Sequence, residues 1–141
     1  MAVYTKITEQ DIGHLFQEYD GIEQLNGITE GVENTNYLVE TNNQKKFIFT
    51  IFEKRTNETD LPFFHKAMNE FNQNGITCPT PIIINKNDIF KIKKKPCAIY
   101  SFIEGRQITT LNNEALISLS KNISAIHNIG SQSNLFRENN M

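Results

Sequence analysis

The sequence predicts an α+β fold, a five-stranded antiparallel sheet with flanking helices that is followed by one further helix. Residues 26–55 contain three strand-like segments joined by short polar turns. The third segment, at residues 47–52, is apolar on both faces, as expected in the middle of a sheet. Residues 82–103 contain further strand-like segments. Three other segments carry apolar residues at spacings of three and four, which is typical of helices that cover a core.

The chain of 141 residues has the composition of an ordinary folded domain, with 38% hydrophobic and 21% charged residues. Its net charge of −2 gives no electrostatic support for binding nucleic acid or an anionic membrane surface. The two cysteines, Cys78 and Cys97, form no pair with metal-ligand spacing. The N-terminus has no basic segment followed by an apolar run, and no apolar stretch is long enough to span a membrane. We therefore expect a cytoplasmic protein without nucleic-acid or membrane partners.

A first helix is predicted to begin at Thr8, because a hydroxyl cap followed three residues later by the acidic Asp11 is a helix-start signal. We expect this helix to end at residues 20–21 and to lie against the sheet through one apolar stripe. The stripe consists of Ile12, Leu15, Phe16 and Tyr19.

A loop at residues 31–36, rich in glycine and asparagine, joins the first two predicted strands. Gly31 tolerates a positive φ, and asparagine does so better than most residues. Such a turn can direct several backbone N–H groups into one concave space, which suits phosphate. A glycine-bearing hairpin above a buried strand also covers the phosphates of ATP in protein kinases. By itself, however, the pattern is more often an ordinary hairpin.

Side chains alternate along the third strand, so that Phe47, Phe49 and Ile51 face one side and Ile48, Thr50 and Phe52 face the other. A second helix is predicted to begin at residues 59–60, with Pro62 in its first turn, and to close at residues 74–75. Its apolar stripe consists of Phe63, Phe64, Ala67, Met68 and Phe71. We expect His65 to lie on the surface of this helix.

After an extended connector at residues 78–81, a strand is predicted to begin at 82–84, with a turn at 85–88, a return at 89–92, a second turn at 93–95 and a last strand at 97–103. A third helix is predicted to begin near Thr110 or Asn112 and to end at residues 128–130. Its apolar residues, which form a wide stripe, are Leu116, Ile117, Leu119, Ile123 and Ile126.

Several motifs resemble the bacterial homoserine kinases of the aminoglycoside-phosphotransferase-like type, whose fold is protein-kinase-like. They are Glu-Gly-Val-Glu-Asn-Thr-Asn-Tyr at 30–37, Phe-Ile-Phe-Thr-Ile-Phe-Glu-Lys-Arg at 47–55, Asp-Leu-Pro-Phe-Phe at 60–64, Gly-Ile-Thr-Cys-Pro-Thr-Pro at 75–81 and Ile-Tyr-Ser-Phe-Ile-Glu-Gly at 99–105. The first five residues fit the same pattern, so the resemblance covers essentially the whole chain in order.

The resemblance implies that ATP, with Mg²⁺ bound to it, is the cofactor. The residues that would cover the phosphates are Gly31, Val32, Glu33, Asn34 and Asn36. The strand end that would hold adenine, in the place of the kinase hinge, consists of Ser101, Phe102, Ile103 and Glu104.

The resemblance leaves one phosphate ligand undecided. Many kinase-like enzymes carry a lysine on the third strand that reaches the phosphates, and here Thr50 holds the matching place. Lys54 follows on the same face but roughly 13 Å further along, at about 3.3 Å per residue. We include both as candidates, although Lys54 and Arg55 also fit a solvated strand end. A threonine at this place is itself similar to the homoserine-kinase pattern.

Phosphoryl transfer also requires acidic residues, one at the attacking hydroxyl and one at the magnesium. The family carries them in a second, mostly helical lobe, in a His-x-Asp-x-x-x-x-Asn loop and an Ile-Asp-Phe-type strand. Neither motif occurs here, and the four aspartates, Asp11, Asp20, Asp60 and Asp88, all precede Gly105. We therefore expect a nucleotide-binding N-lobe and hinge at residues 1–105 and the start of a truncated helical C-lobe at residues 106–141. No catalytic residue and no protein ligand for the metal is expected in this chain.

The function predicted from the resemblance is the ATP-binding part of ATP:L-homoserine O-phosphotransferase of threonine biosynthesis, inactive by itself. The alternatives are a non-catalytic remnant, a nucleotide-binding fragment of a related choline, aminoglycoside or methylthioribose kinase, and a small α+β binding module with an accidental likeness. The expected partners are ATP and, in the full-length enzyme, L-homoserine. A separate chain carrying the C-lobe, or self-association through the helix at 112–128, stays open, and we expect that helix to expose a hydrophobic patch.

Overall fold

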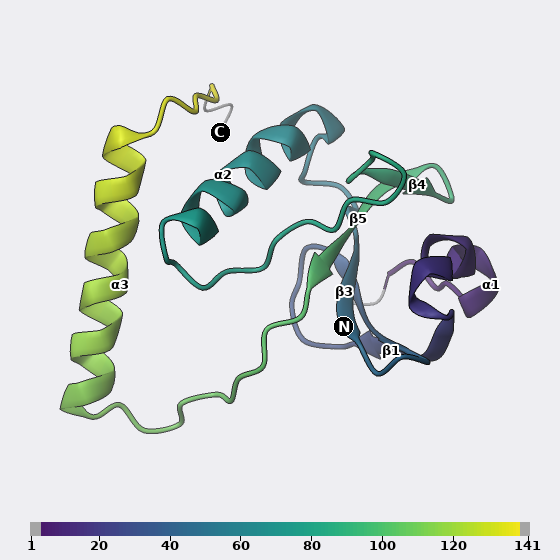
Figure 1. The fold of residues 1–141 in the computed structure, drawn as a ribbon, viewed down its shortest axis with the longest axis horizontal. Coiled ribbons are helices and arrows are strands. Elements are labelled where there is room, and N and C mark those ends of the chain that lie inside the picture. The colour runs from purple at the N-terminus through teal and green to yellow at the C-terminus, as the bar shows by residue number, and fades with distance from the viewer. Residues whose placement is uncertain (1–3, 139–141) are drawn as a thin grey trace. The chain divides into compact units, whose positions relative to one another are not determined.

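The computed structural model describes residues 4–138, which form two compact units (Figure 1). The first unit comprises Met1–Leu61 and Pro81–Phe102, and the second comprises Pro62–Thr80 and Ile103–Met141. A functional division after Gly105 stays a prediction. Among residues 4–138, no helix combines the length and the apolar character that crossing a bilayer requires.

The first unit contains one five-stranded sheet in which all neighbouring strands are antiparallel. The strands are β1 (Ile22–Ile28), β2 (Thr35–Thr41), β3 (Lys46–Ile51), β4 (Phe90–Ile92) and β5 (Lys95–Ser101), in the spatial order β1-β2-β3-β5-β4. The fold class predicted from the sequence is confirmed. The apolar strand β3 occupies the centre, as its two-sided hydrophobic pattern predicts.

One face of the sheet carries the hydrophobic core. Along β2, every second residue from Thr35 to Thr41 is buried and the residues between are half-buried. The register places Tyr37 opposite Phe49 and Val39 opposite Phe47, so both strands direct their buried side chains to the same face. The buried residues of the core are Ile7, Ile12, Leu15, Phe16, Tyr37, Val39, Phe47, Phe49, Ile51, Ile84, Ile92, Cys97 and Ile99.

The N-terminal segment covers this face, but as a broken helix. The structure has a four-residue helix α1 (Glu9–Ile12) followed by the 3₁₀ turns η1 (Gly13–Leu15) and η2 (Gln17–Tyr19), so the prediction of one continuous helix was wrong. Gly13 weakens helix propagation, and Phe16 N–H bonds Gly13 O at 3.1 Å instead of the residue four back. The predicted start is confirmed, because the Asp11 carboxylate accepts from Thr8 N–H at 2.7 Å.

The tighter 3₁₀ turns still place aromatic side chains against the core. The Phe16 ring lies 5.8 Å from the Phe47 ring, centroid to centroid, and the Tyr19 ring lies 4.7 Å from it. Asp20 and Gly21 both have a positive φ and end the segment where the sequence predicts.

Two predicted strand boundaries in the second half of the sheet were wrong. Residues 82–84 form no named strand, because this segment is held by only two isolated bridges, Pro81 to Tyr100 and Ile84 to Asn87. The last strand begins at Lys95 and ends at Ser101 rather than spanning 97–103. Both turns of this region use two consecutive residues of positive φ, which is the turn geometry that matches the twist of a β-hairpin. These residues are Asn85, Lys86, Lys93 and Lys94.

The second unit contains α2 (Leu61–Gln73), whose first residue belongs to the first unit, and α3 (Asn113–Gln132). A 3₁₀ turn, η3 (Glu58–Asp60), precedes α2, and Gly75 follows it at a φ of 87°. Both boundaries agree with the predicted helix. His65 is 2% exposed, however, so its prediction as a surface residue was wrong.

Helix α3 begins as predicted, because the Asn112 side chain accepts a hydrogen bond from Ala115 N–H at 2.8 Å. It continues through Gly130 to Gln132, so the predicted end at residues 128–130 was wrong. No residue of α3 is buried. Its exposed hydrophobic residues include Leu116, Ile117, Leu119, Ile123 and Ile126.

Phe49→Ala should lower the free energy of unfolding by about 3–5 kcal/mol, because Phe49 is fully buried in the central strand and its removal leaves a cavity. Urea unfolding followed by circular dichroism measures this change. Ile83→Ala is the control, because Ile83 is 65% exposed and its truncation should change stability by less than about 0.5 kcal/mol. Equal losses in the two variants would contradict the assignment of the core.

The chain should bind a hydrophobic fluorescent dye through the apolar stripe of α3, because this stripe is exposed along its length. Ile123→Glu should reduce the dye signal by placing a charge in the stripe. Lys121→Glu, at an exposed position of the same helix, should leave it unchanged. A chain that binds no dye would contradict the exposed patch.

Candidate functional site

The loop between β1 and β2 covers residues 29–34, two residues shorter at its C-terminal end than predicted, because Thr35 and Asn36 already belong to β2. Gly31 has a φ of 104°, a backbone conformation that favours glycine. Two contacts tie the loop to its surroundings. The Tyr4 hydroxyl donates to Val32 O at 3.1 Å, and the Arg55 guanidinium pairs with the Glu33 carboxylate at 2.7 Å.

The same loop contains an unsatisfied polar atom. Among residues 4–138, the Asn34 side-chain oxygen is the one buried side-chain oxygen or nitrogen without a hydrogen-bond partner. Leaving such an atom unpaired costs about 1–3 kcal/mol. The loop therefore carries a polar group that a water or a ligand would satisfy.

The face of the sheet opposite the core presents two rows of side chains defined by the register. Leu38, Ile48 and Tyr100 are opposite one another on β2, β3 and β5 and form an apolar row. Asn36, Thr50 and Ala98 form the next row, about 6.6 Å closer to the loop at about 3.3 Å per residue. In this second row the Thr50 hydroxyl donates to the Asn36 side-chain oxygen at 2.8 Å. The structure thus brings the predicted residues Asn36 and Thr50 into contact at the loop end of the sheet.

Among the described residues, no hydrogen bond or ion pair joins Lys54 to Asn36 or Thr50. Lys54 lines a hollow of about 440 Å³ whose other walls are Tyr4, Val32, Glu33, Glu53, Arg55 and Lys95. Val32 and Glu33 belong to the loop, Glu53 follows the end of β3, and Lys95 begins β5. Its predicted role at the phosphates stays a prediction.

The predicted hinge residues lie at the other end of the strands. Ser101 closes β5 and pairs with Phe47, and the Phe102 ring lies 6.0 Å from Lys46 Nζ, centroid to nitrogen. Ile103 and Glu104 follow in the chain and belong to the second unit. Both are exposed, and Ile103 is 38% exposed.

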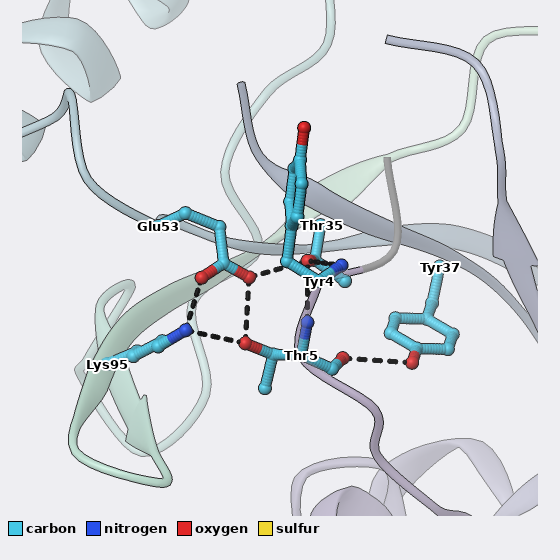
Figure 2. A network of polar contacts seen from close by, with 6 residues as sticks. All are labelled: Tyr4, Thr5, Thr35, Tyr37, Glu53 and Lys95. Carbon is cyan, nitrogen blue, oxygen red and sulfur yellow. Dashed lines mark hydrogen bonds and ion pairs between the residues drawn. The ribbon is translucent and has the colours of Figure 1, made fainter. Parts of the chain in front are cut away.

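A polar network near the loop was missed by the sequence prediction (Figure 2). The Glu53 carboxylate accepts from the Thr5 hydroxyl at 2.7 Å and the Thr35 hydroxyl at 2.6 Å, and it pairs with Lys95 Nζ. Lys95 also donates to the Thr5 hydroxyl at 2.7 Å. The network therefore joins the N-terminal segment, β2, the end of β3 and the start of β5.

The same N-terminal segment is held to β2 by backbone contacts. Tyr4 N–H and Thr5 N–H both donate to the Thr35 hydroxyl, at 2.9 and 3.1 Å. The Tyr37 hydroxyl donates to Thr5 O at 3.0 Å and accepts from Ile7 N–H at 3.2 Å. Figure 2 shows the hydroxyls of Thr5 and Thr35 directed at one oxygen of Glu53.

Burial by itself would raise the pKa of Glu53, whose side chain is 8% exposed, but the hydrogen bonds from Lys95, Thr35 and Thr5 outweigh burial. The pKa of this carboxyl therefore lies below its ordinary value of 4.5. One signal in the sequence points to this residue. Glu53 follows Phe47, Phe49 and Ile51 at a spacing of two residues, so the alternation of the strand directs it to the core-facing side. A charged residue on that side requires a partner.

The Cys97 thiol is not a reactive group in this fold. Burial raises the pKa of the Cys97 thiol to about 12, so it stays protonated and inert. Within residues 4–138, no group of three or more His, Cys, Asp or Glu side chains is arranged to hold a metal ion. The site thus has the parts of a binding surface: a glycine loop, a polar pair and an apolar row.

Glu53→Gln should lower the free energy of unfolding at neutral pH by about 1–3 kcal/mol, because it removes hydrogen bonds to a charged, buried group. A carboxyl with a lowered folded-state pKa contributes its full stabilisation above the ordinary value of 4.5 and loses it as the pH falls through the lower folded value. The difference between the two proteins should therefore shrink in acid, as measured by urea unfolding across a pH series.

The control is Glu58→Gln, which alters an exposed ion pair, Glu58 to Lys91 at 2.9 Å. Exposed pairs contribute about 0–1 kcal/mol, so this variant should be nearly neutral. A Glu53→Gln protein as stable as the unchanged chain at every pH would show that the network does not hold the strands together.

The chain resembles known proteins in sequence. It is 37% identical to a homoserine kinase of Brucella anthropi over 144 residues, covering 100% of this chain and 44% of the relative. It is 34% identical to that of Parvibaculum lavamentivorans, covering 99% and 44%, and 41% identical to that of Brucella ovis, covering 82% and 37%. The resemblance inferred from the motifs is confirmed, and the chain spans less than half the length of these relatives.

Solved structures share the fold. An amicoumacin kinase in complex with AMP-PNP, Ca²⁺ and amicoumacin matches with a TM-score of 0.73 at 18% identity, over 82% of this chain and 37% of that chain. A spectinomycin phosphotransferase in complex with ADP and spectinomycin matches with a TM-score of 0.68 at 16% identity, over 96% and 43%.

A family model for the phosphotransferase enzyme family matches residues 24–139, which include most of β1, all of β2 to β5, and the helices α2 and α3. Because this match extends over most of the chain and the fold agrees with it, the chain belongs to the phosphotransferase enzyme family.

Proposed function

We propose that this chain is the ATP-binding N-terminal part of a homoserine kinase, an ATP:L-homoserine O-phosphotransferase. The observation that carries the proposal is the order of groups on the face of the sheet opposite the core. The end of β5 at Ser101, the apolar row, the Asn36–Thr50 pair and the Gly31 loop follow one another along the strands. This order matches the shape of a nucleotide, with a flat apolar base at one end and anionic phosphates at the other.

The base would lie against Leu38 and Ile48, the half-buried members of the apolar row, with Ser101, Phe102, Ile103 and Glu104 offering main-chain hydrogen bonds at its edge. The phosphates would lie under the loop, where Gly31, Val32, Glu33 and Asn34 supply backbone N–H groups. The unpaired Asn34 oxygen fits this arrangement only through an ordered water of the bound nucleotide, which would supply the missing donor, because phosphate oxygens themselves donate none. Magnesium would arrive with the phosphates, since the described part of the chain contains no metal-ligand cluster of its own.

The acceptor is proposed from the relatives, which are named homoserine kinases at 34–41% identity. The role in threonine biosynthesis and the cytoplasmic location follow from that name and are part of the same proposal. The carboxylates that phosphoryl transfer needs would come from a part of the enzyme beyond these 141 residues, because no aspartate of the chain follows Asp88. A separate C-lobe chain, or a copy of this chain, would meet it through the exposed stripe of α3.

The proposal is tested by titrating Mg²⁺-ATP into the chain and by assaying ADP release with homoserine. The chain should bind ATP but release no homoserine-dependent ADP, because it has no catalytic acids. A fusion that joins the remaining portion of the Brucella anthropi relative after Gly105 should restore ADP release with homoserine and not with choline or spectinomycin. Turnover by the chain alone, or a fusion that prefers another alcohol, would contradict the proposal.

A further inference from the structure

The contact between Thr50 and Asn36 determines which way the Asn36 amide points. In the structure the Thr50 hydroxyl donates to the Asn36 side-chain oxygen at 2.8 Å and so holds that oxygen against Thr50. The two residues are direct cross-strand partners, which limits their freedom to separate. Thr50 is 7% exposed, so water competes weakly for its proton. The amide nitrogen of Asn36 is therefore directed away from β3.

This nitrogen has two N–H donors, and the described part of the chain does not use them. The hydrogen bonds of residues 4–138 include none from the Asn36 nitrogen, and this nitrogen is not among the buried unpartnered atoms, so it is accessible from outside. Asn36 is the second residue of β2, directly after the loop that contains Gly31. An oriented, unused donor pair thus lies at the loop end of the sheet face opposite the core.

We propose that the Asn36 amide nitrogen donates to a phosphate oxygen of the nucleotide and that Thr50 is a positioning residue that orients this amide. The inference rests on the proposed function and deepens it by naming a phosphate-binding side chain. A neutral pair then occupies the strand position where protein kinases carry a lysine. Lys54 lines a separate hollow with Tyr4 and Lys95, and its role at the phosphates stays a prediction.

The test is the affinity of the chain for Mg²⁺-ATP, measured by titration calorimetry. Asn36→Asp should weaken binding at least tenfold, because it removes both donors and places a negative charge beside the phosphates. Thr50→Val should weaken it about threefold or more by releasing the amide, and Thr50→Ser should restore binding to within twofold by returning the hydroxyl. Asn85→Asp is the matched control, because it makes the same change of charge in an exposed turn of positive φ and should leave binding unchanged.

The outcomes separate the inference from the proposed function. An unchanged chain that binds no ATP would refute the nucleotide-binding function and the inference with it. Binding by the unchanged chain that is insensitive to Asn36→Asp and Thr50→Val would refute the inference alone. Tighter magnesium-dependent binding by Asn36→Asp would also refute it, because an oxygen rather than the amide nitrogen would then face the ligand. Circular dichroism and thermal unfolding of each variant show whether weaker binding reflects the site or the fold.

Discussion

The arrangement of the first unit depends on the hydrogen bonds and the ion pair of the Glu53 carboxylate. Glu53 lies just after the central strand β3, and its hydrogen bonds reach Thr5, Thr35 and Lys95, which come from three other segments of the chain. A buried carboxylate is stable only when its oxygens are paired, so the four segments must meet where Glu53 places them. Because Thr35 begins β2, this requirement also sets where the loop at residues 29–34 ends.

The two faces of the sheet differ because one is completed by the N-terminal turns. Phe16 and Tyr19 pack on Phe47, and this face holds the whole core cluster of the first unit. The opposite face holds Leu38 and Ile48, which are half-buried, and the Asn36–Thr50 pair. A packed face thus supports a partly buried face on which Thr50 orients Asn36 in advance, which is how a binding surface keeps its geometry without a ligand.

Membership of the phosphotransferase enzyme family bears on the exposed apolar stripe of α3. The relatives are more than twice as long as the matched segment, since the chain covers 37–44% of them. Helix α3 lies wholly within the matched region and exposes its apolar stripe. Exposed apolar stripes of this kind mark surfaces that other elements cover.

Local chemistry in the sequence was sufficient for most of the elements. Alternation along β2 and β3, glycine and asparagine in the loop, Asn112 at the start of α3 and Gly75 after α2 act over a few residues, so they can be recognised without a structure. The fold class and the order of the elements followed from them. The same local signals placed Gly31, Asn34 and Asn36 at the loop end of the sheet.

Contacts between distant residues were decided only by the tertiary structure. Glu53 and Lys95 are 42 positions apart and Asn36 and Thr50 are 14 apart, so their pairing depends on strand register, which no local pattern specifies. Packing against the sheet likewise replaced one regular helix by α1, η1 and η2, because the tighter turns bring Phe16 and Tyr19 onto Phe47. The residue types of a binding surface were visible in the sequence, whereas the direction of each polar group was set by partners that folding brought together.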